Sequence, residues 1–461
     1  MKLYDTLSKK KGDFRTLAKK KVRLFVCGPT VYDHSHIGHG RTYVVFDAFV
    51  KYLRNRGYEV QYIQNITDID DKIITRAQKE KKDARALART YEKEYHADMK
   101  ALGVDAVTKC ARATDYIPKI IRQIKTLIKK GYAYETETGV YFEVAKFPNY
   151  GKLSGQNIKM LERSTRIEKD TSKHDAVDFA LWKKAKPGEP TWDSPWGKGR
   201  PGWHIEDTAI TETELGPQYD VHGGSRDLIF PHHEAEIAQM ETASGKKPLV
   251  RYWMHTGFLT LENVKMSKSL GNVITIQDLL ASYSLYDFRL FILSKHYRSP
   301  ITYTKRYLKE AKAQRARIEE FIRKLANAGG VTTLKDKKYI RNAQKKFWAA
   351  LADDFSVPGA LSVLFALISH VNKRLDKETL GKREADALGK FFAELNTIFN
   401  IINFTREAEP RPESAVLKLV KEREMLRREK KWQKADVLRK KIERLGYAID
   451  DTPSGSHLRR I

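Results

Sequence analysis

Apolar residues in the first part of the chain follow two different repeats. Residues 22–27 place apolar side chains on both faces of an extended segment, which is typical of a strand buried in a parallel sheet. From His36 the apolar positions recur at helical spacing until Gly57 supplies a C-terminal cap, and residues 60–66 predict a second strand. This order predicts a βαβ unit, whose helix N-terminus points free N–H groups at an anion. The pattern therefore favours an α/β fold with a nucleotide pocket.

The pattern changes between residues 116 and 202. A hairpin is expected at Thr138-Gly139, with a strand over residues 140–142. Four tryptophans crowd into a segment rich in proline and glycine, and we expect all of them except Trp203 to be structural. We interpret this region as an insertion between the two halves of the nucleotide fold.

Three further stretches predict helices. Residues 78–99 form a strongly charged repeat with a thin apolar stripe, which favours a helix of the scaffold. Residues 282–329 and 353–375 predict long amphipathic helices. Their basic faces would suit phosphate contacts, although a solvated basic face is an alternative.

The tail from residue 414 predicts two charged helices and a short strand at residues 447–449. Trp432 lies on the apolar stripe of the second helix and is expected in its core. Two prolines mark a linker before the tail. We therefore divide the chain into the following parts: 1–115, first half of a Rossmann-type catalytic domain; 116–202, connective insertion; 203–300, second half; 301–400, α-helical bundle; 401–413, linker; 414–461, small C-terminal α+β domain.

Composition indicates which class of partner the protein binds and in which cell compartment it works. The 461 residues are too many for one core, and 86 Lys plus Arg against 58 Asp plus Glu give a net charge of +28. Such an excess favours a nucleic-acid partner through counterion release, with a solvated basic surface as the alternative. Only two cysteines, no apolar leader and no long apolar run indicate a reducing, cytoplasmic location without membrane contact.

Candidate chemistry lies at the start of the first helix. His36 and His39 share one face of its first turn, and Gly38 and Gly40 leave room for a base or phosphate. Far downstream, residues 265–269 place two lysines on a small-residue loop that could carry cations to a polyphosphate. HIGH at residues 36–39 is weak alone, because a histidine-rich helix cap would look the same. Together with KMSKS, however, it resembles the signatures of class I aminoacyl-tRNA synthetases.

The surrounding residues resemble one family of that class. FVCGPTVYDHSHIGHGRT, NITDIDDKII, RPGWHIE, HGGSRDLIFPHHEAEIAQ and VKMSKSLGN are similar to cysteinyl-tRNA synthetases, and the likeness runs nearly end to end. The resemblance implies ATP, L-cysteine and tRNA(Cys) as substrates. It also implies that the helical bundle holds the tRNA stem and that the C-terminal domain binds the anticodon.

A metal site is part of this resemblance. Pro231 is expected to open a helix in which His232 and Glu236, four residues apart, share one face as metal ligands should. The resemblance matches Cys27, Asp207, His232 and Glu236 to the family's zinc ligands, although the family has a second cysteine at the position of Asp207. We expect one Zn²⁺ to remain, held more weakly and with greater Lewis acidity, and to select the substrate thiol. A degenerate site is the alternative. Cys110 has no neighbouring ligands in the sequence and is expected to be an ordinary cysteine.

The resemblance also implies further roles around ATP and the amino acid. Mg²⁺ is expected with ATP, although no residue marks its ligands. The residues expected near the phosphates are His36, His39, Lys265 and Lys268. Those expected near the ribose are Gly223, Gly224 and Asp227. Those expected near the amino acid are Tyr32, Thr67 and Trp203.

The resemblance therefore implies a cysteine:tRNA ligase, which we expect to be a monomer. Cysteine and ATP would form cysteinyl-adenylate and pyrophosphate, and the tRNA would then accept the cysteine. One alternative is a ligase that joins cysteine to an amino sugar, which the basic bundle and the tail oppose. A catalytically silent RNA-binding paralogue is the other, which the intact HIGH and KMSKS motifs oppose.

Overall fold

The computed structural model describes residues 1–156, 171–261, 264–265, 273–330, 338–404, 414–452 and 455–460. It divides into two compact units, Met1–Ile402 and Asn403–Ile461. In the described part of the chain, every helix is too short or too polar to cross a lipid bilayer.

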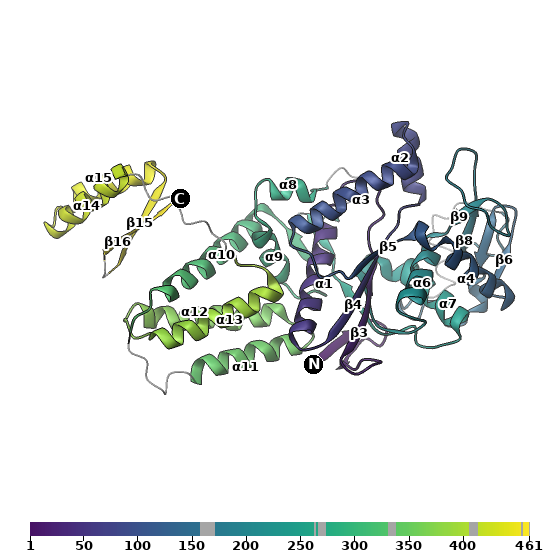
Figure 1. Ribbon diagram of the computed structural model, residues 1–461, viewed down its shortest axis with the longest axis horizontal. Coiled ribbons are helices and arrows are strands. Elements are labelled where there is room, and N and C mark those ends of the chain that lie inside the picture. The colour runs from purple at the N-terminus through teal and green to yellow at the C-terminus, as the bar shows by residue number, and fades with distance from the viewer. Residues whose placement is uncertain are drawn as a thin grey trace. The chain divides into compact units, whose positions relative to one another are not determined.

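A five-stranded parallel sheet forms the centre of the first unit (Figure 1). Its order is β11 (Val250–Thr256), β10 (Tyr219–Ser225), β3 (Lys21–Val26), β4 (Glu59–Ile66) and β5 (Lys109–Arg112). The sheet grows in one direction from β3 to β5 and in the other through β10 to β11. The strand order therefore reverses beside β3, and a parallel sheet binds ligands at the carboxyl ends of its strands at such a point. The predicted βαβ unit and α/β class are confirmed.

The helix that follows β3 starts beside this point. α1 (Ile37–Asn55) is capped by His36, whose Nδ1 accepts hydrogen bonds from the backbone N–H groups of Gly38 and His39 at 3.1 and 3.4 Å. Most of α1 is buried, and Gly57 follows it with a φ of 78°, as the predicted cap requires.

The charged stretch after β4 contains two helices rather than one. α2 (Asp71–Glu80) ends at Lys81 in a left-handed conformation, and α3 (Ala84–Ala101) starts after Asp83, whose carboxylate accepts from the N–H of Ala86 at 2.8 Å. The prediction of a continuous helix over residues 78–99 is wrong, because Asp83 is a strong N-cap within the helical repeat.

The inserted region carries a four-stranded antiparallel sheet. Its strands are β6 (Ala133–Glu135), β7 (Gly139–Phe142), β8 (Phe179–Lys184) and β9 (Gly199–Pro201), and the predicted hairpin at Gly139 is confirmed. Trp182 and Trp196 are buried there and Trp192 is half-buried. The same core includes α4 (Ile117–Lys129), α6 (Trp203–Glu214) and α7 (Glu234–Ser244), so the insertion packs against one face of the central sheet.

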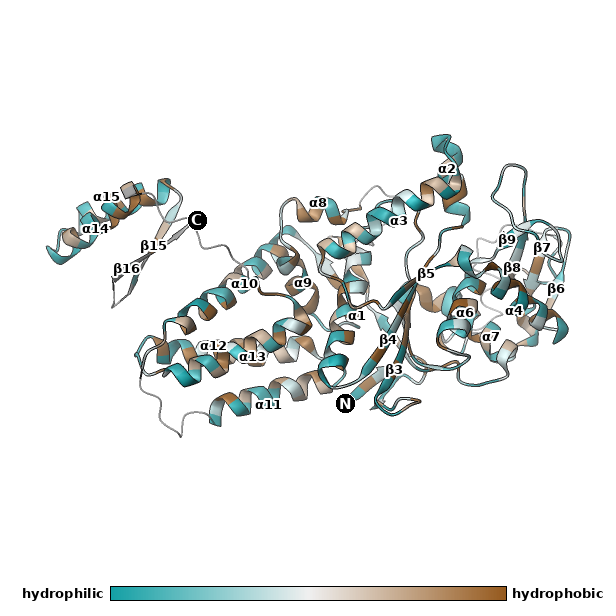
Figure 2. Cartoon of the chain, in the orientation of Figure 1, coloured by the Kyte–Doolittle hydropathy of each residue, from teal (hydrophilic) through white to brown (hydrophobic). Residues whose placement is uncertain are grey.

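Helices cover the other end of the first unit. They are α8 (Ile276–Leu280), α9 (Leu285–Leu293), α10 (Lys305–Ala326), α11 (Lys338–Ala352), α12 (Val357–Leu375) and α13 (Lys382–Phe399). Small sheets lie beside them: β1 (Lys2–Asp5) with β2 (Lys10–Asp13), and β12 (Leu259–Leu261) with β13 (Val264–Lys265) and β14 (Ile301–Tyr303). Figure 2 shows apolar residues along the sheet strands and polar residues on the outer helix faces.

One buried arginine joins these helices to the sheet region. Arg289 of α9 donates to Asp47 of α1 at 2.7 Å and to the carbonyl oxygens of Phe399 and Leu102 at 2.7 and 3.2 Å. Both charged groups are fully buried and paired with each other, so this ion pair fixes α1 against α9.

The second unit is small. It contains α14 (Ser414–Arg428), α15 (Trp432–Arg444) and a hairpin of β15 (Tyr447–Thr452) and β16 (Gly455–Arg460). The two predicted helices are confirmed, but the single short strand is a two-stranded hairpin. Trp432 is 54% exposed, so its predicted place in the core is wrong; Val416, Val420, Ile442 and Ile449 fill the core instead.

Candidate active site

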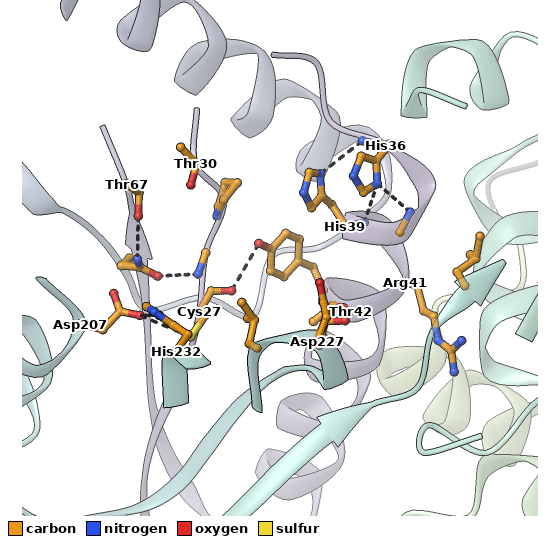
Figure 3. A pocket seen from close by; sticks show the side chains of 18 of the residues that line it. Cys27, Thr30, His36, His39, Arg41, Thr42, Thr67, Asp207, Asp227 and His232 are labelled. Carbon is orange, nitrogen blue, oxygen red and sulfur yellow. Dashed lines mark hydrogen bonds and ion pairs between the residues drawn. The ribbon is translucent and has the colours of Figure 1, made fainter. Parts of the chain in front are cut away.

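A cavity of about 530 Å³ opens at the carboxyl ends of the central strands (Figure 3). Its walls come from the ends of β3, β4 and β10, from the start of α1 and from α6. Most of the predicted site residues line it: Cys27, Tyr32, His36, Gly38, His39, Thr67, Trp203, Asp207, Asp227 and His232. Segments that are far apart in the sequence thus meet at the point where the strand order reverses.

The histidine pair forms one side of the cavity. The His36 and His39 rings stack with their centroids 3.8 Å apart, and His39 Nδ1 accepts from the N–H of His36 at 3.3 Å. The two residues therefore form a reciprocal cap on α1, so the helix-cap explanation of this motif is correct as far as local structure goes. The cap also fixes both rings at the edge of the cavity.

The opposite side is a buried cluster of metal-ligand side chains. Cys27, Asp207, His232 and Glu236 bring one ligand atom each within 4.8 Å of one another. Cys27 Sγ lies 3.4 Å from Asp207 Oδ2, and His232 Nε2 lies 2.9 Å from Asp207 Oδ2 and 3.2 Å from Glu236 Oε1. The structure therefore brings together all four residues that the resemblance assigned to one metal.

The polar atoms of this cluster are incompletely satisfied. Asp207 Oδ1 and both carboxylate oxygens of Glu236 are buried without a hydrogen bond among the described residues. Burial and the carboxylates of Asp207 and Glu236 raise the pKa of the Cys27 thiol, and burial and Asp207 raise the pKa of Glu236. A bound cation would compensate these charges and favour the thiolate, so the residues fit a metal ion.

The segment that carries His232 has a kink at Phe230. Phe230 is the residue of Ile229–His233 with non-helical backbone angles (φ −134°, ψ 133°), and the helical turn from Pro231 continues into α7 at Glu234, in agreement with the prediction that Pro231 opens this helix. His232 still approaches Glu236, because the turn leads directly into α7. Trp203 stacks on the His232 ring with the centroids 4.2 Å apart, so the exposed indole lines the cavity beside the metal cluster.

A hydrogen-bond network holds the side of the cavity that contains Thr67. The N–H of Gly28 donates to Asn65 Oδ1 at 2.5 Å, and the Thr67 hydroxyl donates to the carboxylate of Glu206. Sequence reasoning assigned no role to Asn65 or Glu206. Glu206 lies inside the GWHIE signature, which was the available signal, and it is buried directly behind Thr67.

The predicted glycines have different surroundings. Gly38 lines the cavity, whereas Gly40, Gly223 and Gly224 are not among the described residues that line it. A Cβ at Gly223 would lie 2.4 Å from Phe46, and one at Gly224 would lie 2.8 Å from the His233 ring. At Gly40 it would lie 3.0 Å from Phe288. These glycines permit close packing behind the cavity.

The KMSKS loop falls mostly outside the described residues. Lys268 lies outside them, and of Lys265 only the backbone is described, where it pairs with Thr260. Cys110 is half-buried and lies apart from the metal cluster, as expected.

Comparison with known families defines the class. Residues 13–313 match the family model for the catalytic domain of class I (C) tRNA synthetases, and residues 346–403 match the DALR domain. In solved structures, a Mycobacterium tuberculosis methionyl-tRNA synthetase with methionyl-adenylate superposes with a TM-score of 0.62 at 16% identity, covering 82% of this chain and 88% of that chain. An Agrobacterium radiobacter K84 LeuRS–tRNA–LeuAMS complex gives 0.62 at 10% identity, covering 84% and 85%. These structures show the fold, and the matched domain defines a class I aminoacyl-tRNA synthetase.

Curated relatives narrow the class further. A cysteine–tRNA ligase of Thermodesulfovibrio yellowstonii is 45% identical and covers 98% of both chains. One of Thermococcus onnurineus is 44% identical and covers 100% of this chain and 99% of its own. The chain therefore belongs to the cysteine–tRNA ligase family.

Proposed function

We propose that this chain activates L-cysteine with ATP and transfers it to the 3′ end of tRNA(Cys). The observation that carries the proposal is the cavity itself, which has a buried cluster of Cys, Asp, His and Glu on one side and the HIGH histidines on the other. Substrates bound on the two sides would bring the cysteine carboxylate to the α-phosphate, so that cysteinyl-adenylate and pyrophosphate form.

On the amino-acid side, Cys27, Asp207, His232 and Glu236 would hold Zn²⁺. When bound, this ion supplies a borderline-soft acceptor that favours a thiolate over the hydroxyl of serine. Asp207 contributes a carboxylate where the family pattern has a thiolate, and its formal charge is the same. Trp203 and Tyr32 would enclose the amino acid, and Thr67, oriented by Glu206, would orient it.

On the nucleotide side, His36 and His39 would donate to the ATP phosphates. Gly38 lets the phosphates approach the start of α1, and Asp227 would accept hydrogen bonds from the ribose hydroxyls. Lys265 and Lys268 would stabilise the charge that develops on the α-phosphate, with Mg²⁺ accompanying ATP. Gly40, Gly223 and Gly224 would contribute by letting the supporting elements pack closely.

The rest of the chain would bind the tRNA. The DALR match at residues 346–403 and the net charge of +28 support a tRNA rather than an amino sugar as acceptor. We assign the stem to the helices of residues 301–400 and the anticodon to residues 414–461, where Trp432 offers an exposed plane for base stacking beside Arg427. A monomer would suffice for all of these contacts.

Amino-acid-dependent ATP–pyrophosphate exchange tests the proposal. We expect exchange with cysteine and little with serine, followed by charging of tRNA(Cys) transcript. Equal exchange with both amino acids would contradict the selectivity, and exchange without charging would contradict the tRNA acceptor. Purified protein should contain one zinc per chain, whereas iron or manganese would contradict the metal assignment.

A further inference from the structure

The metal cluster contains a second complete set of ligand atoms. Cys27, His222, His233 and Glu236 also bring one ligand atom each within 4.8 Å of one another, and all four side chains are buried. We call this the inner set, and Cys27, Asp207, His232 and Glu236 the outer set. The two sets share Cys27 and Glu236, so one ion at a time can use either.

Distances within the inner set fit a tetrahedral ion. Cys27 Sγ lies 3.5 Å from His222 Nε2 and 3.1 Å from His233 Nε2. Glu236 lies 3.5 Å from His222 Nε2 through Oε2 and 4.0 Å from His233 Nε2 through Oε1. Zinc with nitrogen, oxygen and sulfur ligands at their usual lengths separates these atoms by about 3.3–3.8 Å. Small shifts therefore suffice for coordination.

Each histidine of the inner set has a polar partner at the ring nitrogen that faces away from the cluster. His222 Nδ1 lies 2.6 Å from the Tyr219 hydroxyl, and His233 Nδ1 lies 2.8 Å from His255 Nε2, whose Nδ1 lies 2.9 Å from the Thr6 hydroxyl. A hydrogen bond at one ring nitrogen, with the other nitrogen facing the cluster, is the arrangement that fixes metal-ligating imidazoles. Sequence reasoning missed both residues, although each lies in a quoted signature.

The two sets differ in access and in charge. Cys27, Asp207 and His232 line the cavity, whereas His222 and His233 are not among the described residues that do. Cys27 and Glu236 bring two negative charges to either set, and Asp207 adds a third to the outer one. A divalent ion is therefore neutralised by the inner set, while the outer set leaves a buried excess negative charge, which is costly.

We propose that the cation has two positions that share the ligands Cys27 and Glu236. The inner set holds the ion whenever Asp207 does not coordinate it. The inner position retains the ion with four protein ligands away from the cavity, and the outer position presents it to the substrate. This inference rests on the metal part of the proposed function, but it does not require cysteine to be the substrate.

Two variants remove only the outer position, by different residues: Asp207→Asn and His232→Gln. Each protein is dialysed beside the parent at one fixed free Zn²⁺ concentration, and its zinc content is measured together with its circular dichroism. We expect each folded variant to keep about one zinc per chain. X-ray absorption at the zinc edge should show two imidazole ligands and one sulfur ligand in Asp207→Asn.

A second step removes the inner position. Adding His222→Gln and His233→Gln to Asp207→Asn should lower zinc affinity by about tenfold or more, the scale on which supporting residues tune metal sites. His296→Gln in the same background is the matched control, because His296 is a half-buried histidine beside Asp354 that belongs to neither set.

Three results would overturn the inference: folded Asp207→Asn and His232→Gln proteins that both lose their zinc, a combined variant that keeps as much as Asp207→Asn alone, or a parent protein that binds no divalent ion. The first two leave the proposed function standing. Conversely, a parent that keeps zinc but fails cysteine-dependent exchange would contradict the proposed function and leave the inner position intact.

Discussion

On one side of the cavity, Asp207 and Glu236 have buried carboxylate oxygens that form no hydrogen bond within the described residues. On the other side, His36 and His39 accept hydrogen bonds from each other's backbone N–H groups and cap the first turn of α1. The cation side is thus completed by something that the described chain does not supply. The histidine pair, in contrast, has its cap hydrogen bonds within the described chain. Variants on the two sides should therefore fail in different ways.

The largest effect is expected on the nucleotide side, from Lys268→Ala. Because His36 and His39 each accept a backbone N–H at Nδ1, each ring can donate to the phosphates only through Nε2, and we expect the loop lysines to supply most of the positive charge beside the α-phosphate. Losing one such donor removes about 3 kcal/mol of transition-state stabilisation, or roughly a hundredfold in the rate of adenylate formation. Single-turnover adenylate formation measures it, with exposed Lys295→Ala as the control. A wild-type rate would contradict the assignment of this loop.

On the cation side, Cys27→Ser should alter selectivity more than the rate with saturating ATP. Cys27 belongs to both ligand sets, so its loss removes both metal positions. A site that rejects serine through a bonded thiol can discriminate by about ten thousandfold, whereas size alone gives about a hundredfold or less. The ratio of kcat/KM for cysteine and serine should fall accordingly. Cys110→Ser, at the other, half-buried cysteine, should leave that ratio unchanged.

The two sides also differ in how far the sequence predicts them. Residues 22–27 and the helix after His36 are continuous local patterns, and both predicted elements are confirmed. The metal cluster draws on four separate segments, so only the resemblance could place Asp207 beside Cys27. His222 and His233 escaped notice because their role depends on β10 lying next to β3, which is a property of the sheet order.

Other errors have equally local causes. Asp83 breaks the helical repeat through its capping side chain, which a hydrophobic repeat does not reveal. Trp432 lies on an apolar stripe, but the small second unit is too thin to cover it, and the side chain remains 54% exposed. Periodicity indicates which face of a helix is apolar, whereas burial depends on the size of the neighbouring core.

A smaller effect is expected from Gly28→Ala, which should disturb both the metal cluster and the nucleotide side of the cavity. A Cβ at Gly28 would lie 1.7 Å from the Asn65 carbonyl oxygen, so the end of β3 must move away from β4. Forced overpacking of this kind costs about 1–3 kcal/mol of unfolding free energy, measurable by urea denaturation. Gly12→Ala, where a Cβ meets nothing within 4 Å, is the control. Unchanged stability together with normal zinc content and exchange would show that the two sides are not joined through this residue.

The smallest effect is expected from Thr67→Val, which separates amino-acid positioning from metal-based selection. Without the Thr67 hydroxyl, the buried Glu206 carboxylate loses a hydrogen bond, at a cost of about 1–3 kcal/mol. Much of this cost falls on the folded protein, so we expect the KM for cysteine to rise by about tenfold at most. Thr67→Ser keeps the hydroxyl and should restore the parent value. The preference for cysteine over serine should persist, because both amino acids need the same positioning and only the cation distinguishes sulfur from oxygen. If Thr67→Val abolished that preference as Cys27→Ser does, selectivity would come from the shape of the cavity rather than from its buried ligand cluster.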